Sequence, residues 1–247
     1  VTWSTMGEFM DTVEGGGIAN NMVFQVGHNA LRRAVLGRED RHLTEDEMRT
    51  MERLTAEALD AGALGLSFGL EFMPGRASDS EECRRLCAVA AQRNKMTAWH
   101  VRNRDRKFVE AVDEAIWATR EAGAGLQLAH LSAKPGSSPR AWNRVMESVR
   151  RARAEGHDVQ ADMIAYVVGP GLLSTILPNW VSQGSTEEIQ ARLRDPEARK
   201  KMVEQSDRYW FLFYYREWDK LTLTGGKSHP EWLGKTFREI GQETGKD

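Results

Sequence analysis

The sequence predicts an α/β protein built on a parallel sheet, and three observations support that fold class. Short apolar runs, each ending in a small or polar residue, alternate with long amphipathic stretches over residues 22–162. The run ends are evenly spaced, with 33 residues from Ser67 to His100, 30 from His100 to His130 and 32 from His130 to Asp162. Because parallel neighbours need long crossover connections, this repeat predicts βα units. Its regularity favours a (β/α)8 barrel over a doubly wound sheet, which periodicity alone does not exclude.

Five strands are expected from the apolar runs, since turn residues separate each run from the next element. They are residues 22–26, 63–67, 96–100, 126–130 and 158–162. A complete eight-unit barrel usually needs about 250 residues, and five units already end by Asp162. The sequence therefore predicts a partial barrel, with βα units over residues 1–166.

Helix start and stop signals lie between these runs. Thr44 and Glu47 form a capping-box pattern, Gly123 is a natural terminator, and Pro139 is tolerated in a first helical turn. The predicted helices are residues 44–61, a helix capped by Ser78 or Ser80 that runs to about 93, residues 106–122 and residues 139–155.

The βα pattern breaks after Asp162. Residues 167–247 read as irregular and helical, with helices expected at 186–193, 196–205 and 234–245. Residues 209–215 are apolar and aromatic, so strand and buried helix both stay open there.

Composition favours a small-molecule partner. The 34 lysines and arginines nearly balance the 36 aspartates and glutamates, so no strong field of one sign attracts nucleic acid or an anionic membrane. No apolar run reaches about 18 residues, so no membrane span is expected.

Cys83 and Cys87 lie four apart on one predicted helical face and read as buried thiols, which fits a reducing, cytoplasmic setting. The chain starts without methionine or a signal-peptide pattern, and it looks like a piece of something longer.

The chemistry is expected at the carboxyl ends of the strands, where parallel α/β folds form their active clefts. His100 and His130 end neighbouring predicted strands about 5 Å apart, so both imidazoles can reach one zinc ion at about 2.0 to 2.1 Å. A single histidine at a strand end is more often structural, so the prediction of a metal site depends on the pair. Asp162 reads as a ligand, as a general base for metal-bound water, or as a loop cap. Ser67 reads as turn or packing.

Other polar residues near these ends allow two interpretations. Arg102 and Arg104 follow His100, where a guanidinium can clamp a carboxylate or can be a solvated surface charge. His28, after Gly27, is expected to have a structural role in a loop.

Motifs along nearly the whole chain carry a family resemblance. They include Val26-Gly27-His28, Gly65-Leu66-Ser67, Gly69-Leu70 with Pro74-Gly75, His100-Val101-Arg102, Gln127-Leu128-Ala129-His130-Leu131, Asp158-Val159 with Asp162, Leu177-Pro178 with Trp180, and Gly234-Lys235-Thr236. In these the chain resembles the N-acyl-D-amino-acid deacylases, or D-aminoacylases, of the amidohydrolase superfamily, and it looks like a central fragment of one.

The resemblance implies a (β/α)8 barrel of which strands three to seven are present, beside a small β-domain. It implies that His100 and His130 are the zinc ligands of the fifth and sixth strands. The family's His-x-His, metal-binding cysteine and catalytic aspartate would lie outside residues 1–247, so the general base is not among these residues and the isolated fragment is expected to be inactive. Asp162 becomes a substrate-side residue, and residues 167–247 become an insertion before the last strand.

The resemblance also implies substrate-binding positions, three of which depart from the family pattern. Phe72 stands where the family has tyrosine, and Ser132 stands where it has lysine, unless Lys134 substitutes. Ile164-Ala165-Tyr166 replaces Tyr-Pro-Tyr. The candidates for substrate binding are Phe72, Arg102, Ser132, Asp162 and Tyr166.

The expected function is zinc-dependent hydrolysis of a linear amide, as in removal of the acyl group from N-acyl-D-amino acids. The alternatives are a cyclic-amide hydrolase of the hydantoinase or dihydroorotase type, and a non-catalytic protein that retains the fold.

Overall fold

The computed structural model describes residues 3–37, 39, 41–134, 136–166, 169, 171–205 and 216–246. The chain divides into two compact units, Val1–Gly169 and Pro170–Asp247. The first unit contains the βα repeat. That the second unit is an insertion before a last barrel strand stays a prediction.

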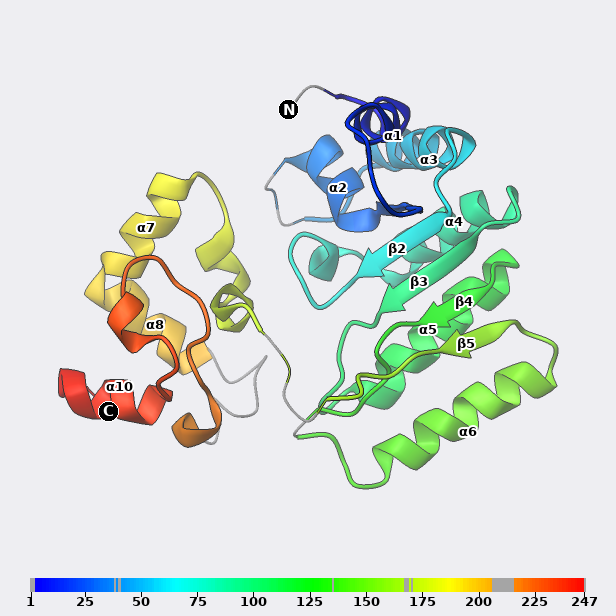
Figure 1. Ribbon diagram of the computed structural model, residues 1–247. Coiled ribbons are helices and arrows are strands. Elements are labelled where there is room, and N and C mark those ends of the chain that lie inside the picture. The colour runs from blue at the N-terminus through cyan, green and yellow to red at the C-terminus, as the bar shows by residue number, and fades with distance from the viewer. Residues whose placement is uncertain are drawn as a thin grey trace. The chain divides into compact units, whose positions relative to one another are not determined.

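The first unit is built on a parallel sheet whose five strands lie in sequence order (Figure 1). The strands are β1 (Gln25–Gly27), β2 (Gly65–Gly69), β3 (Met96–His100), β4 (Leu126–Leu128) and β5 (Val159–Ala161). Each neighbouring pair is parallel. The α/β class is confirmed, and β3 has the predicted bounds.

The predicted position of Ser67 at a strand end is wrong. Strand β2 continues to Gly69, and Gly69, not Ser67, is the register partner of His100. Ser67 pairs with Ala98 inside the sheet. The apolar run ended at Ser67 in sequence, but pairing with β3 extends the strand by two residues.

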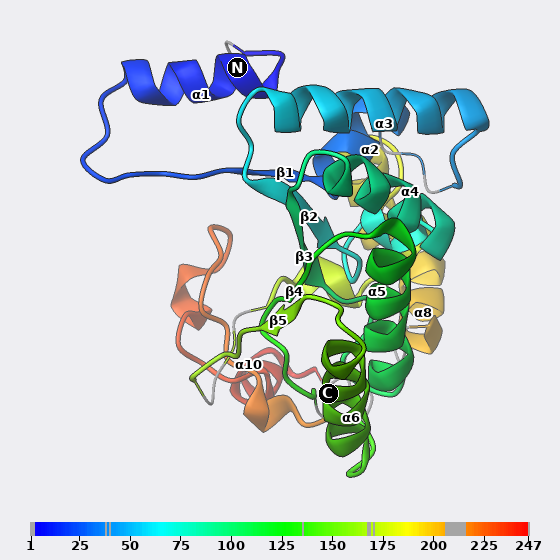
Figure 2. The same cartoon turned by 90° about the vertical axis from the view of Figure 1, so that its right-hand side faces the viewer.

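Helices connect successive strands and cover one face of the sheet. They are α2 (His28–Leu36), α3 (Glu45–Asp60), α4 (Ser80–Ala91), α5 (Phe108–Ala122) and α6 (Ala141–Ala154). Figure 2 shows α4, α5 and α6 side by side along the same side of the strands. Helices α2 and α1 (Met6–Gly15) were not predicted, although Thr5 and Glu8 form a capping box at the start of α1.

The observed helix caps confirm some of the predicted caps and correct others. The Thr44–Glu47 capping box starts α3, and Gly123, at φ 69°, ends α5 in the left-handed conformation that glycine adopts readily. The side chain of Asp79, rather than Ser78 or Ser80, accepts the cap hydrogen bond of α4. Pro139 precedes α6 instead of lying in its first turn.

The core lies between the sheet and these helices. Phe68 on β2 and Trp99 on β3 are almost fully buried, and their ring centroids are 4.3 Å apart. Burying a large apolar side chain stabilises a fold by about 1.5 to 3 kcal/mol. Because successive side chains of a strand alternate between faces, burying Trp99 against the helices directs His100 to the other face.

The second unit is mainly helical. It contains α7 (Thr186–Arg194), α8 (Pro196–Gln205), α10 (Phe237–Thr244), and the 3-10 turns η2 (Leu173–Ile176), η3 (Asn179–Ser182), η5 (Trp218–Lys220) and η6 (Pro230–Trp232). Helix α8 has the predicted bounds, and the ambiguous segment 209–215 lies outside the described residues. Among the helices that the structure describes, none has the length and apolar character needed to cross a membrane.

Candidate functional site

The carboxyl ends of β2 to β5 meet at one edge of the sheet and bring four polar side chains together there. His100 is the last residue of β3, and Glu71 lies two residues beyond β2. His130 lies two residues beyond β4, and Asp162 directly follows β5. The two predicted metal ligands, His100 and His130, therefore lie at the same edge of the sheet, as their spacing in the sequence predicted. This edge is called the rim below.

His100 lies between a second imidazole and a carboxylate. Its Nδ1 is 2.8 Å from Nε2 of His130, and its Nε2 is 2.6 Å from Oε2 of Glu71. The two imidazole rings are nearly perpendicular, with centroids 4.4 Å apart. The two histidines thus point ring nitrogens at each other rather than apart.

Glu71 carries its negative charge in a largely buried place. Its side chain is 11% exposed and contacts Lys134 through Oε1, and a nitrogen of Arg104 lies 3.9 Å from Oε2. Burial alone would raise the pKa of this carboxyl. The hydrogen bond from His100 and the charge of Lys134 outweigh burial and lower the pKa to about 2.

The backbone of His130 is held in an uncommon conformation. Its φ of 39° lies in the left-handed region, which non-glycine residues rarely adopt. Its N–H donates to Oδ1 of Asp162 at 2.6 Å, and its carbonyl accepts from Arg104 at 3.1 Å and from Ser132 at 3.3 Å. Gln127 donates to the other oxygen of Asp162 at 2.8 Å. Asp162 therefore holds the turn that carries His130.

The surroundings of the His130 ring favour its neutral form. Burial lowers its pKa, and the neighbouring charge of Arg104 lowers it further. Its Nδ1 is buried without a hydrogen-bond partner among the described residues. A neutral imidazole is the form that binds a metal ion.

The remaining predicted substrate residues lie in different surroundings. The ring of Phe72 lies against His100, with centroids 4.7 Å apart. Arg102 donates to both oxygens of Glu114, at 3.0 and 2.9 Å, and to the carbonyl of Arg76 at 3.0 Å. Tyr166 is 81% exposed. The structure thus groups Phe72, Ser132 and Asp162 with the histidines.

The expected loop position of His28 is wrong. His28 is the first residue of α2 and is fully buried. Its Nε2 lies 2.7 Å from Glu82 of α4, and Arg32 contacts the second oxygen of the same carboxylate. This triad joins two helices, so the role of His28 is structural but is exercised from a helix.

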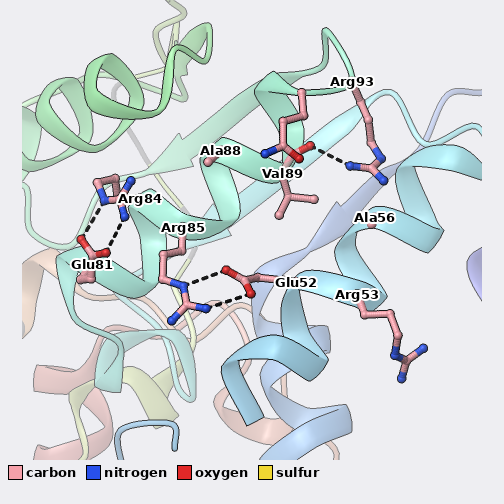
Figure 3. Close-up of a pocket in the computed structure, with 10 residues that line it drawn as sticks. Glu52, Arg53, Ala56, Glu81, Arg84, Arg85, Ala88, Val89 and Arg93 are labelled. Atoms are coloured by element: carbon pink, nitrogen blue, oxygen red, sulfur yellow. Dashed lines mark hydrogen bonds and ion pairs between the residues drawn. The ribbon is translucent and has the colours of Figure 1, made fainter. Parts of the chain in front are cut away.

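A surface groove lies between α3 and α4 (Figure 3). Its arginines are paired with carboxylates, for example Arg84 with Glu81 and Arg85 with Glu52, at 2.5 to 2.9 Å. These pairs occupy the charged groups that would otherwise bind a ligand. We therefore place the functional site at the strand ends.

The donors at the strand ends match part of a zinc site. Two nitrogens that both bind a tetrahedral zinc ion at about 2.05 Å are about 3.3 Å apart, so the 2.8 Å pair needs to separate by about half an ångström. Within the described residues, no group of three or more His, Cys, Asp or Glu side chains is arranged to hold a metal ion. The residues present thus fit two ligands of a site whose other ligands they do not supply.

Glu71 is the residue that sequence reasoning missed. It lies between Leu70 and Phe72, and no motif marks it. The available signal was its position: a carboxylate just past one strand end, beside a strand that ends in histidine. Its contact with His100 depends on the β2–β3 register, in which Gly69 lies opposite His100.

Comparison with known proteins identifies relatives of this chain by sequence and by structure. No family model matches the chain. An N-acyl-D-glutamate deacylase of Alcaligenes xylosoxydans xylosoxydans is 34% identical over 166 residues, which cover 66% of this chain and 33% of that protein. A D-aminoacylase of the same organism is 26% identical over 166 residues, covering 67% and 34%. The chain thus spans about a third of the length of the curated relatives it matches.

A solved structure has the same fold. The crystal structure of the N-acyl-D-glutamate deacylase of Bordetella bronchiseptica, complexed with zinc and a phosphonate inhibitor that mimics the tetrahedral intermediate, matches with a TM-score of 0.78. The match covers 99% of this chain and 44% of that one at 23% identity. At 23% identity, this structural similarity is evidence for the fold alone.

Proposed function

Because the chain is homologous to a stretch of the N-acyl-D-amino-acid deacylases, we propose that the protein hydrolyses the amide of N-acyl-D-amino acids with the help of zinc. The observation that carries the proposal is the convergence of His100 Nδ1 and His130 Nε2 at the strand ends. A zinc ion bound there supplies a Lewis acid that polarises the amide carbonyl and lowers the pKa of water towards about 7.

The side chains of this chain have distinct roles in the proposed site. His100 and His130 bind the metal, and Asp162 holds the backbone turn that carries His130. Phe72 forms an apolar wall against the His100 ring. The general base and the other metal ligands come from outside the described residues, as the family resemblance implies.

Two cationic groups lie beside the proposed metal ligands and give a net positive charge around the single carboxylate of Glu71. Arg104 and Lys134 lie at this rim, although both contact Glu71. An N-acyl-D-amino acid carries a carboxylate that such cations attract. We propose that the substrate is a small molecule, an acylated amino acid. We propose a cytoplasmic setting, with which the two free, buried cysteines agree.

The proposal is tested by turnover of the zinc-loaded full gene product. N-acetyl-D-glutamate, N-acetyl-D-methionine, hydantoin and dihydroorotate are supplied separately, and release of the free amine or ring-opened product is measured. We expect hydrolysis of the acylated D-amino acids and its loss in His100→Ala and His130→Ala. His157→Ala, a part-buried histidine at the opposite end of the sheet, is the matched control. Turnover of the cyclic amides alone, or of none of the four, would overturn the proposal.

A further inference from the structure

A carboxylate outside the expected ligand set contacts the nitrogen of His100 that faces away from His130. Glu71 Oε2 lies 2.6 Å from His100 Nε2, while His100 Nδ1 faces His130 at 2.8 Å. An ionised carboxylate only accepts hydrogen bonds. Nε2 of His100 must therefore carry the hydrogen, and in the neutral ring Nδ1 keeps its lone pair.

Positively charged side chains near both oxygens of Glu71 orient its carboxylate. Lys134 donates to Oε1 of Glu71, and Arg104 lies 3.9 Å from Oε2. Glu71 and His100 are 11% and 14% exposed, so water has little access to compete for this contact. Two cations on other loops thus hold the acceptor in place before any ligand arrives.

On this geometry we propose that Glu71 is a positioning residue, which locks His100 in the Nε2–H tautomer and aims its Nδ1 lone pair at the point shared with His130. The inference rests on the proposed metal role of the two histidines. Hydrogen-bond partners behind metal-bound histidines commonly fix the tautomer and orientation of the ring in this way. In the metal-free chain the contact also makes His130 donate its own Nε2–H to His100. To bind a metal ion through Nε2, the neutral His130 ring would carry its hydrogen on Nδ1 instead.

Histidine tautomers can be read directly by two-bond ¹H–¹⁵N correlation spectra of the metal-free protein. The spectra are taken above the ordinary histidine pKa of about 6.5, with His100→Ala assigning the signal. We expect the wild-type protein to show one tautomer at His100, protonated at Nε2. Glu71→Ala should give a mixture, whereas Glu71→Gln, which keeps an acceptor oxygen, should restore most of the Nε2–H form.

Zinc affinity is the second readout, measured by competition with a chelating dye. Removing a hydrogen-bond partner of a metal-bound histidine typically weakens metal binding by about 10- to 100-fold, and we expect that loss in Glu71→Ala with partial recovery in Glu71→Gln. The matched control is Glu114→Gln, which removes a carboxylate of similar exposure, 13%, that pairs with Arg102 and contacts no histidine. Circular dichroism checks folding, and Glu71→Gln keeps the test usable if Glu71→Ala does not fold.

Two results would overturn the inference: an unchanged His100 tautomer in Glu71→Ala, or an equal change in Glu114→Gln. The proposed function fails in a different way. If wild-type protein shows the locked tautomer but binds no zinc, the positioning contact stands and the metal role of the histidines does not.

Discussion

His130 shows how single residues build the site. A non-glycine residue in an uncommon backbone region costs about 1 to 3 kcal/mol and persists only where its surroundings fix it. Here the carboxylate of Asp162 fixes the N–H, and Arg104 and Ser132 fix the carbonyl. The conformation turns the imidazole out of the strand direction and towards His100.

Asp162→Ala should loosen this turn. The change removes the acceptors of the His130 N–H and of Gln127, so we expect a loss of about 1 to 3 kcal/mol in the free energy of unfolding and zinc binding weakened by about 10-fold or more. Urea unfolding and zinc titration measure the two effects. Asp158→Ala, at the amino end of β5, is the control, and equal zinc affinity in Asp162→Ala and the wild type would contradict the role of this carboxylate.

Arg102 was expected to clamp a substrate carboxylate, and its surroundings explain why the sequence alone could not decide its role. Three of its nitrogens donate to Glu114 and to the Arg76 carbonyl. Those partners lie 12 and 26 residues away along the chain, so no local pattern reveals them. The substrate role of Arg102 stays a prediction.

At the scale of elements, the parts predicted best were those specified by local signals. The capping box at Thr44, the glycine end of α5 and the alternating run of β3 depend on residues within a few positions of one another. The extension of β2 to Gly69 and the contact of Glu71 depend on pairing between strands. Such pairing is set by tertiary packing, which periodicity does not report.

The buried triad of His28, Arg32 and Glu82 joins α2 to α4 and allows a test of helix packing. Glu82→Gln leaves the guanidinium of Arg32 buried without its carboxylate. Breaking a buried pair by removing one partner destabilises a protein by about 3 to 5 kcal/mol, and we expect a loss of that size near pH 7 by urea unfolding. Glu81→Gln, an exposed neighbour on the same helix, should change the free energy of unfolding by less than about 1 kcal/mol.

The carboxylate of Glu82 also makes the free energy of unfolding depend on pH, and Glu82→Gln tests this dependence. Burial would raise the pKa of Glu82, but the hydrogen bonds from His28 and Arg32 outweigh it, so the pKa in the folded protein lies below 4.5. The stability from this carboxylate is present above pH 4.5 and is lost as the pH falls through the folded-state pKa, because the unfolded chain takes up the proton first. Wild-type protein should thus lose more unfolding free energy below pH 4.5 than Glu82→Gln. Parallel curves for the two proteins would contradict this account.

At the scale of the whole molecule, the evenly spaced repeat predicted the unit that carries the site. Five parallel strands in sequence order place His100, His130 and Asp162 at one edge. The second unit lacks such a repeat, and helices α7 and α10 bury none of their described side chains. Helix positions in this unit could be predicted from its sequence, as for α8, but its function could not.

The chain matches about a third of the length of its curated relatives. Among the described residues, β1 and β5 each pair with another strand on one side only. That this sheet is part of a larger barrel stays a prediction.

The central claim is that His100 and His130 bind one metal ion together, and zinc binding to the purified protein tests it most directly. Zinc is titrated into wild-type protein, His100→Ala, His130→Ala and His157→Ala, and X-ray absorption identifies the donor atoms. We predict imidazole nitrogens at about 2.0 to 2.1 Å from zinc in wild-type protein and in His157→Ala, and binding weakened by more than about 100-fold, beyond the usual effect of an indirect partner, in either of the other variants. Zinc bound to His100→Ala or His130→Ala as tightly as to the wild type would contradict the claim.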